Sequence, residues 1–153
     1  MAIGSDEKTR VTEAVTEYLQ NKGVEVEPHG PLTGQPMDWA DVARAVGERV
    51  ASGGVDQGLL FCWTGTGTSI AANKVPGIRA ALCHDVYSAH QCVEHDDVNV
   101  MCLGAQIVGS TLALELIKTF LDARFSTEEH FRRRVRKLHE MERRFAEEMQ
   151  RSP

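Results

Sequence analysis

Short apolar runs alternate with amphipathic stretches along this chain, and the alternation limits the folds that it can adopt. Gly58 to Cys62 is a continuous apolar run without polar alternation, which is typical of a strand buried on both faces. Further short strands are expected at residues 2–4, 24–26, 79–83 and 98–103. Between them, helical spacing predicts helices near residues 11–19, 39–50, 69–74, 85–94 and 112–120. Strand and helix therefore alternate, and this order predicts an α/β, Rossmann-like three-layer fold with a five-stranded parallel sheet.

Two details of the helices are expected from local patterns. Asp38 is a suitable cap for the second helix, and Trp39 falls on its apolar face with Val42 and Val46. The sequence Ser126-Thr127-Glu128-Glu129 resembles a capping box before a long, highly charged C-terminal helix with a narrow apolar stripe. Since 153 residues fit one domain, we expect residues 1–153 to form a single domain. We expect its C-terminal helix, at about 126–150, to pack on a partner subunit; packing on its own domain is the alternative.

Composition argues against several classes of protein. The net charge of −5 disfavours a nucleic-acid binder, so the basic run at 132–137 is expected to be a solvated or interface face. No stretch approaches the roughly 20 apolar residues of a membrane helix, and no signal peptide is evident, so we expect a cytoplasmic protein without a membrane partner. The four cysteines lack zinc-like spacing, so free thiols are expected, with Cys83 and Cys102 as buried core residues and no metal.

Ligands of parallel sheets bind where the strands end, which directs attention to residues 5–7, 62–67 and 83–85. At the second of these, Cys62 precedes the turn Thr64-Gly65-Thr66-Gly67 and a predicted helix. Glycines let the backbone approach a ligand, and a helix start offers free N–H groups to a phosphate or an enediolate oxyanion. A helix start also favours a thiolate at Cys62, although a core cysteine without chemistry is the alternative. His95 is a candidate acid or base, or else a solvated loop histidine.

Several blocks recur in the order found in one known family. They are Gly4-Ser5-Asp6, the run from Cys62 to Lys74 with its Ser-Ile-Ala-Ala-Asn-Lys ending, Pro76 to Ala80, Tyr87-Ser88-Ala89, His95 to Val100, and Leu103-Gly104-Ala105. Over nearly the whole chain they resemble the ribose-5-phosphate isomerase B and galactose-6-phosphate isomerase family. The resemblance implies aldose–ketose isomerisation without a metal or cofactor, on a sugar or sugar-phosphate substrate. It also implies a homodimer with shared active sites, with a tetramer left open.

The resemblance also implies roles for individual residues. Cys62 matches the base that moves a proton between C1 and C2, and Thr64 matches a residue that assists proton transfer between the hydroxyls. Gly65, Thr66 and Gly67 match the cradle for the enediolate. Asp6, together with His95 from the partner subunit, matches the pair linked to ring opening. Asn73 and Asp96 match substrate-contacting positions.

The chain departs from the family where the phosphate binds. Glu7 replaces a histidine, Gln106 replaces an arginine, and His130 with Arg134 replaces a pair of arginines. Trp63 replaces a small residue beside the base, which should reshape the sugar pocket. One reading keeps a sugar phosphate such as ribose 5-phosphate, with other cations near the site (Lys8, Arg10, Arg132 or Arg133) replacing the lost groups. In the other, the sugar is unphosphorylated or atypical and Glu7 binds a hydroxyl. A non-catalytic sugar-binding protein is the alternative outside the enzymes.

Overall fold

The sheet has five parallel strands, as predicted, in a computed structural model that describes residues 1–151. Their order across the sheet is β2-β1-β3-β5-β4. The strands are β1 (Ala2–Ser5), β2 (Glu27–His29), β3 (Gly58–Cys62), β4 (Ala80–Leu82) and β5 (Val100–Gly104). Every residue of β3 and β5 is buried, which explains why their sequences are apolar throughout.

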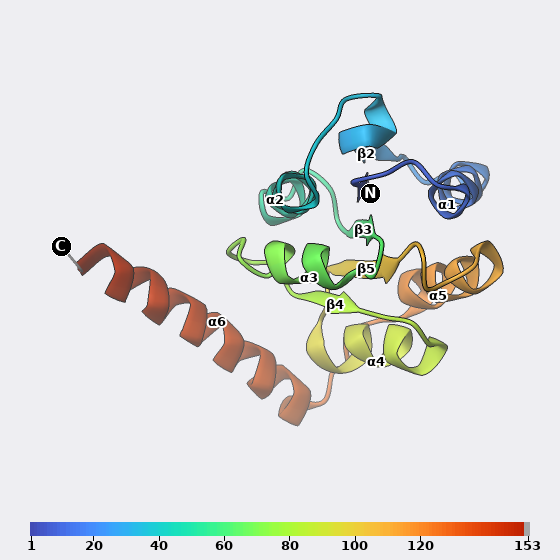
Figure 1. The fold of residues 1–153 in the computed structure, drawn as a ribbon. Coiled ribbons are helices and arrows are strands. Elements are labelled where there is room, and N and C mark those ends of the chain that lie inside the picture. The colour runs from blue at the N-terminus through green and yellow to red at the C-terminus, as the bar shows by residue number, and fades with distance from the viewer. Residues whose placement is uncertain (152–153) are drawn as a thin grey trace.

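Helices cover both faces of the sheet and give the predicted three layers (Figure 1). On one face α1 (Arg10–Asn21), α4 (Val86–Asp96) and α5 (Ser110–Asp122) pack on Leu59, Phe61 and Met101. On the other face α2 (Trp39–Ala51) and α3 (Thr66–Ala72) pack on Leu60 and Cys102. Successive residues of one strand thus enter two separate cores, as side-chain alternation requires. A 3₁₀-helix, η1 (Gly30–Thr33), follows β2.

The strand register decides where the site forms. Ser5 of β1 pairs with Phe61 of β3, and Cys62 of β3 pairs with Gly104 of β5. The three central strands therefore end side by side. The loops that follow them meet at one edge of the sheet, which is the edge predicted to bind the ligand.

Three expected positions were wrong in detail. The second strand begins at Glu27, because the amide of Val24 instead donates to the Leu19 carbonyl (3.0 Å) and closes the end of α1. Helix α3 begins at Thr66 rather than Ser69, because Gly65 turns the chain directly into it. The capping box is not formed in the expected register: α6 (Glu129–Arg151) begins later, and the Ser126 hydroxyl accepts from the Glu128 amide at 3.1 Å.

Helix α6 leaves the body of the domain and projects away from it (Figure 1). Near its start Val135 is buried, and further along Glu142 accepts a hydrogen bond from the Gly77 amide (2.9 Å). The apolar stripe beyond Val135 is exposed, at Leu138, Met141, Phe145 and Met149. None of the helices between residues 1 and 151 is long and apolar enough to cross a membrane.

Candidate active site

A cavity of about 340 Å³ lies at the carboxyl ends of β1 and β3. Its lining is formed by Asp6 from the loop after β1, by the first residue of α2, and by the strand end and turn after β3: Asp6, Trp39, Cys62, Trp63, Thr64 and Gly67. Four of these six were expected to be site residues from the sequence alone. The structure therefore brings Asp6, Cys62, Thr64 and Gly67 together.

One backbone hydrogen-bond donor points at the sulfur of Cys62. The Gly65 amide donates to Sγ at 3.1 Å, while the Thr68 hydroxyl, 3.6 Å from Sγ, has the nearer Gly65 carbonyl as an acceptor at 3.1 Å. Donors aimed at a sulfur stabilise negative charge on it. The side chain is 7% exposed, and it faces the cavity, so the sulfur is shielded from bulk water and still within reach of a ligand.

The turn after Cys62 depends on glycine at position 65. Gly65 has φ +75, in the left-handed region, and a Cβ atom there would lie 2.8 Å from the Leu103 carbonyl carbon and 3.0 Å from the Gly104 nitrogen. The turn is therefore packed directly on the end of β5. Because the Gly65 amide donates to Cys62 and the Thr66 amide donates to the Thr64 hydroxyl (3.3 Å), the Gly67 amide in the first turn of α3 is the one beside the cavity that is left for a ligand.

Asp6 lies at the cavity, and its carboxyl group is partly buried without a full set of hydrogen bonds. Its Oδ1 atom is buried and has no hydrogen-bond partner in the described chain. Burial raises the pKa of Asp6 above its ordinary value; its own backbone amide opposes part of this shift, and the nearby charge of Glu7 adds a smaller increase. An unpaired, partly desolvated carboxyl next to a cavity is suited to exchanging a proton with a ligand.

Glu7 and Trp63, the two departures nearest the base, contact each other. The indole Nε1 of Trp63 donates to Oε2 of Glu7 at 3.0 Å. Glu7 is fixed through its backbone, since its amide donates to the buried Ser5 hydroxyl (3.2 Å), which in turn donates to the Glu7 carbonyl (2.6 Å). Gln106 is adjacent through its backbone, where its amide donates to the Trp63 carbonyl at 3.0 Å, while its side chain is exposed.

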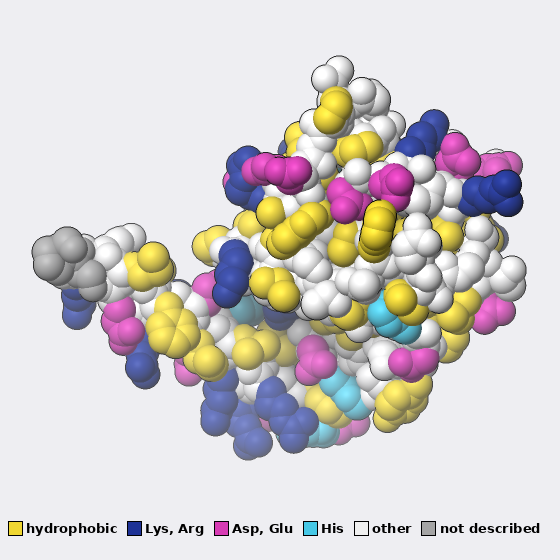
Figure 2. Space-filling model, viewed as in Figure 1, with side chains coloured by type: hydrophobic (Ala, Val, Ile, Leu, Met, Phe, Trp, Pro, Cys, Tyr) yellow, Lys and Arg dark blue, Asp and Glu magenta, His cyan; other side chains and the backbone are white. Residues whose placement is uncertain are grey.

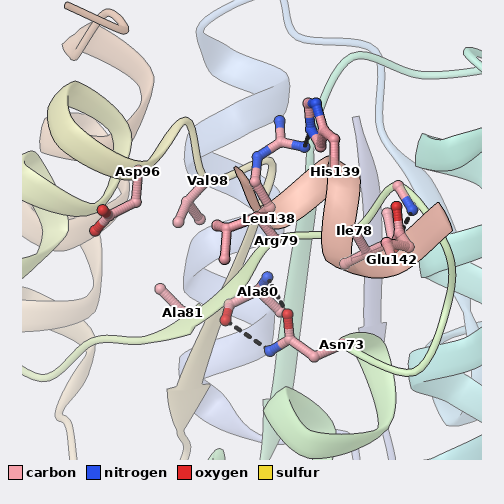
Figure 3. Close-up of a pocket in the computed structure, with 11 residues that line it drawn as sticks. Asn73, Ile78, Arg79, Ala80, Ala81, Asp96, Val98, Leu138, His139 and Glu142 are labelled. Carbon is pink, nitrogen blue, oxygen red and sulfur yellow. Dashed lines mark hydrogen bonds between the residues drawn. The ribbon is translucent and has the colours of Figure 1, made fainter. Parts of the chain in front are cut away.

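Asn73 and Asp96 lie at a different place, a cavity of about 310 Å³ between β4 and α6 (Figure 3). The Asn73 amide is already used by the backbone: Nδ2 donates to the carbonyls of Ser69 (2.9 Å) and Ala80 (2.8 Å), and Oδ1 accepts from the Ala80 amide (2.9 Å). In this structure Asn73 therefore joins the end of α3 to β4, and its amide points away from the Cys62 cavity.

His95, His130 and Arg134 form a separate cluster around Phe131. The His95 ring stacks on Phe131 at 4.0 Å, the His130 ring lies 3.8 Å from it, and the Arg134 guanidinium lies 5.8 Å from its centre. His95 is near the C-terminal end of α4, which starts at the ligand-binding edge and runs to the opposite edge of the sheet. Within one chain these residues therefore lie apart from Cys62. Lys and Arg side chains gather where α6 begins (Figure 2).

The other cysteines are free thiols away from the cavity, as expected for Cys83 and Cys102. Burial raises the pKa of the Cys102 thiol to about 12, so this thiol is neutral at physiological pH. The Cys83 sulfur donates to that of Cys92 at 3.9 Å, and this contact together with burial raises the pKa of Cys83. Cys62 is thus the cysteine that faces the candidate active site.

Sequence reasoning missed two residues of the site, Thr68 and Trp39. For Thr68 the available signal was a polar residue in the first turn of the helix after β3, whose side chain points back to the strand end. Trp39 was assigned to the buried face of α2, but it is 43% exposed and lies over Gly67. Its position at the start of a helix, at the ligand-binding edge, was the available signal.

Comparisons with known proteins identify the family of the chain. A family model described as Ribose/Galactose Isomerase matches residues 1–138. The chain is 41% identical to D-erythrulose-4-phosphate isomerase of Pectobacterium atrosepticum, covering 82% of this chain and 84% of the relative. It is 40% identical to ribose-5-phosphate isomerase B of Escherichia coli, covering 78% and 80%. The solved structure of Clostridium thermocellum ribose-5-phosphate isomerase B superposes with a TM-score of 0.88 at 40% identity, covering 94% of this chain and 97% of that chain.

Proposed function

The chain belongs to the ribose/galactose isomerase family of sugar-phosphate isomerases, and we propose that Cys62 is the base of its aldose–ketose isomerisation. The observation that carries this proposal is the position of Cys62, which faces the cavity while the Gly65 amide donates to its sulfur. As a thiolate, it would remove the proton from C2 of an open-chain aldose and return it to C1, giving the ketose without net redox change. Ribose 5-phosphate, or a sugar phosphate with four carbons, would be a substrate consistent with the names of the related proteins.

The remaining groups of the cavity have complementary roles in this proposal. The Gly67 amide stabilises the oxygen of the enediolate, which carries the charge as the proton leaves. The Thr64 hydroxyl lines the cavity and moves a proton between O1 and O2. Asp6, whose buried Oδ1 atom has no hydrogen-bond partner in the described chain, exchanges the proton that ring opening requires.

The cluster around Phe131 has a role in this proposal as part of a second copy of the chain. We propose that α6 packs on a partner subunit and that the partner's His95, His130 and Arg134 complete the site. The exposed stripe on α6 and the separation of this cluster from Cys62 within one chain support the proposal. Arg134 would then supply the positive charge that a sugar phosphate needs, because no Lys or Arg lines the Cys62 cavity among residues 1–151.

Glu7 favours a second class of substrate, an unphosphorylated or atypical sugar, which would undergo the same isomerisation. Among residues 1–151 no Lys or Arg forms an ion pair with Glu7, whose carboxylate instead accepts from Trp63. A carboxylate without a cation repels a dianion and accepts readily from a hydroxyl. Comparing kcat/KM for ribose 5-phosphate, erythrose 4-phosphate and the free sugars decides between the classes.

Proton exchange tests the assignment of the base. Incubation of ribose 5-phosphate or erythrose 4-phosphate in D₂O should place deuterium at C2, and Cys62→Ala should slow this exchange by about 10²–10⁴-fold, the range for loss of an acid–base group. Cys102→Ala is the matched control, because it removes a buried thiol that does not line the cavity. Unchanged exchange in Cys62→Ala would mean that another group is the base.

A further inference from the structure

Both tryptophans of this chain line the Cys62 cavity, and both are exposed. The sequence contains two tryptophans in total. Trp39 is 43% exposed and Trp63 is 63% exposed, although indole is among the largest apolar side chains. Large apolar side chains left open together at a site usually meet a ligand or another protein there.

Each indole is held in place by its own contacts. The Trp39 ring covers Gly67 so closely that a Cβ atom at this glycine would lie 3.0–3.2 Å from three ring atoms. The Trp63 ring is fixed by its hydrogen bond to Glu7. The buried Ser5 hydroxyl holds the backbone of Glu7, so a continuous set of bonds runs from β1 to the Trp63 ring. Neither ring therefore depends on a ligand for its position.

We propose that Trp39 and Trp63 form an aromatic cradle that binds the carbon skeleton of the sugar, with Glu7 as the positioning residue for Trp63. The proposal rests on the proposed function, because its ligand is the sugar phosphate of that reaction. One face of a sugar presents C–H bonds, which pack on aromatic rings, while its hydroxyls need polar partners at the edge. The cavity offers this combination, with Asp6 and Thr64 beside the two indoles.

The charges of the cavity support a skeleton-binding role rather than a phosphate-binding one. Of the six lining residues, Asp6 is the one with a charged side chain, and it is acidic. The adjoining cavity of about 370 Å³ shares Asp6 and is lined also by Asp38, again with no Lys or Arg among the described lining residues. A phosphate would be repelled here, so the cradle holds the neutral part of the substrate.

Fluorescence of the two indoles tests the cradle directly. Cys62→Ala is titrated with ribose 5-phosphate or erythrose 4-phosphate, so that binding is measured without turnover, and inorganic phosphate is the control ligand. The sugar phosphates should change the emission saturably and inorganic phosphate should not. Trp63→Ala should weaken sugar-phosphate binding, measured by calorimetry, at least about tenfold, and Trp63→Phe by much less, because it keeps an aromatic face.

Two variants of Glu7 separate positioning from charge. In Glu7→Gln the side-chain carbonyl can still accept from the indole, whereas Glu7→Ala removes the acceptor. Glu7→Ala should raise KM about tenfold while kcat falls far less, and Glu7→Gln should restore KM. A general loss of folding would lower both parameters and would not be rescued by glutamine.

Failure of the cradle is distinguishable from failure of the proposed function. If sugar phosphates leave the emission unchanged while Cys62-dependent exchange persists, the cradle is wrong and the isomerase assignment stands. An emission that follows protein concentration instead of sugar would also overturn the cradle, since a partner chain would then cover the indoles. If no sugar phosphate undergoes exchange in the unmodified protein, the proposed function itself fails.

Discussion

Replacing Gly65 with alanine should lower the free energy of unfolding by about 2–5 kcal/mol. The left-handed backbone at φ +75 costs a non-glycine residue roughly 1–2 kcal/mol. The new methyl would meet the backbone of Leu103 and Gly104 at 2.8–3.0 Å, and such overpacking costs about 1–3 kcal/mol more. Backbone atoms of a central strand cannot move aside as a side chain can, so the second cost should appear in full.

Gly23→Ala is the matched control for this prediction. Gly23 has nearly the same φ, +74, but a Cβ atom there would have no neighbour within 4 Å. Its loss should therefore be only about 1–2 kcal/mol. Loss of glycine freedom in the unfolded chain is common to both variants and cancels in their difference. Urea unfolding followed by far-UV circular dichroism measures both values, and it avoids the tryptophans, which lie at the site.

Activity gives the same pair of variants a second readout. The Gly65 amide donates to Cys62, and the turn holds the neighbouring amides, so Gly65→Ala should lower kcat by about 10²-fold, as for loss of one positioned donor. Gly23→Ala should leave kcat unchanged, since Gly23 follows α1 and lies outside the site. Equal stability losses in the two variants would refute the packing argument, and an unchanged kcat in Gly65→Ala would refute the role of the turn.

Three further predictions concern other residues of the site. Asp6→Asn should lower activity yet raise the urea midpoint at pH 7, because the raised pKa means that the charged carboxyl destabilises the folded state; the gain should shrink as the pH falls and Asp6 becomes protonated in the unmodified protein. A difference in urea midpoint between Asp6→Asn and the unmodified protein that stays the same at every pH would contradict this prediction. Asn73→Ala should cost about 1–3 kcal/mol in the same assay, because Ala80 loses both partners, and Asn73→Asp should not rescue it, because a carboxylate cannot donate to the carbonyls of Ser69 and Ala80. Arg134→Ala should raise KM for ribose 5-phosphate at least about tenfold but not for ribose; equal effects would exclude a phosphate contact.

The ligand-binding edge could be predicted because it follows from local patterns. The apolar run ending at Cys62 identifies a strand buried on both faces, and the glycines after it identify a turn that opens a helix. Parallel topology then places Asp6 beside Cys62, because the ends of neighbouring strands meet. The family resemblance added the roles of these residues.

Contacts between distant loops could not be predicted from the sequence. The hydrogen bond between Trp63 and Glu7 joins two loops 56 residues apart, and its existence depends on the register of β1 with β3. Helical spacing assigned Trp39 to the core, yet the start of a helix lies at the rim of the sheet, where the core ends. The start of the second strand was predicted wrongly for a local reason. The backbone amide of Val24 donates to a carbonyl at the end of α1, so it does not pair with the sheet.

The position of β5 between β3 and β4 has a consequence for how the chain is made. Strands β1, β2 and β3 can pair as soon as residue 62 has been synthesised, but β4 pairs only with β5, which comes later. Until residues 100–104 leave the ribosome, the growing chain carries one open edge on β3 and one strand without a partner. Open edges of this kind attract other chains. A stalled or shortened chain that lacks β5 would lose the pairing of two strands at once, so this one segment decides whether the nascent protein closes its sheet or aggregates.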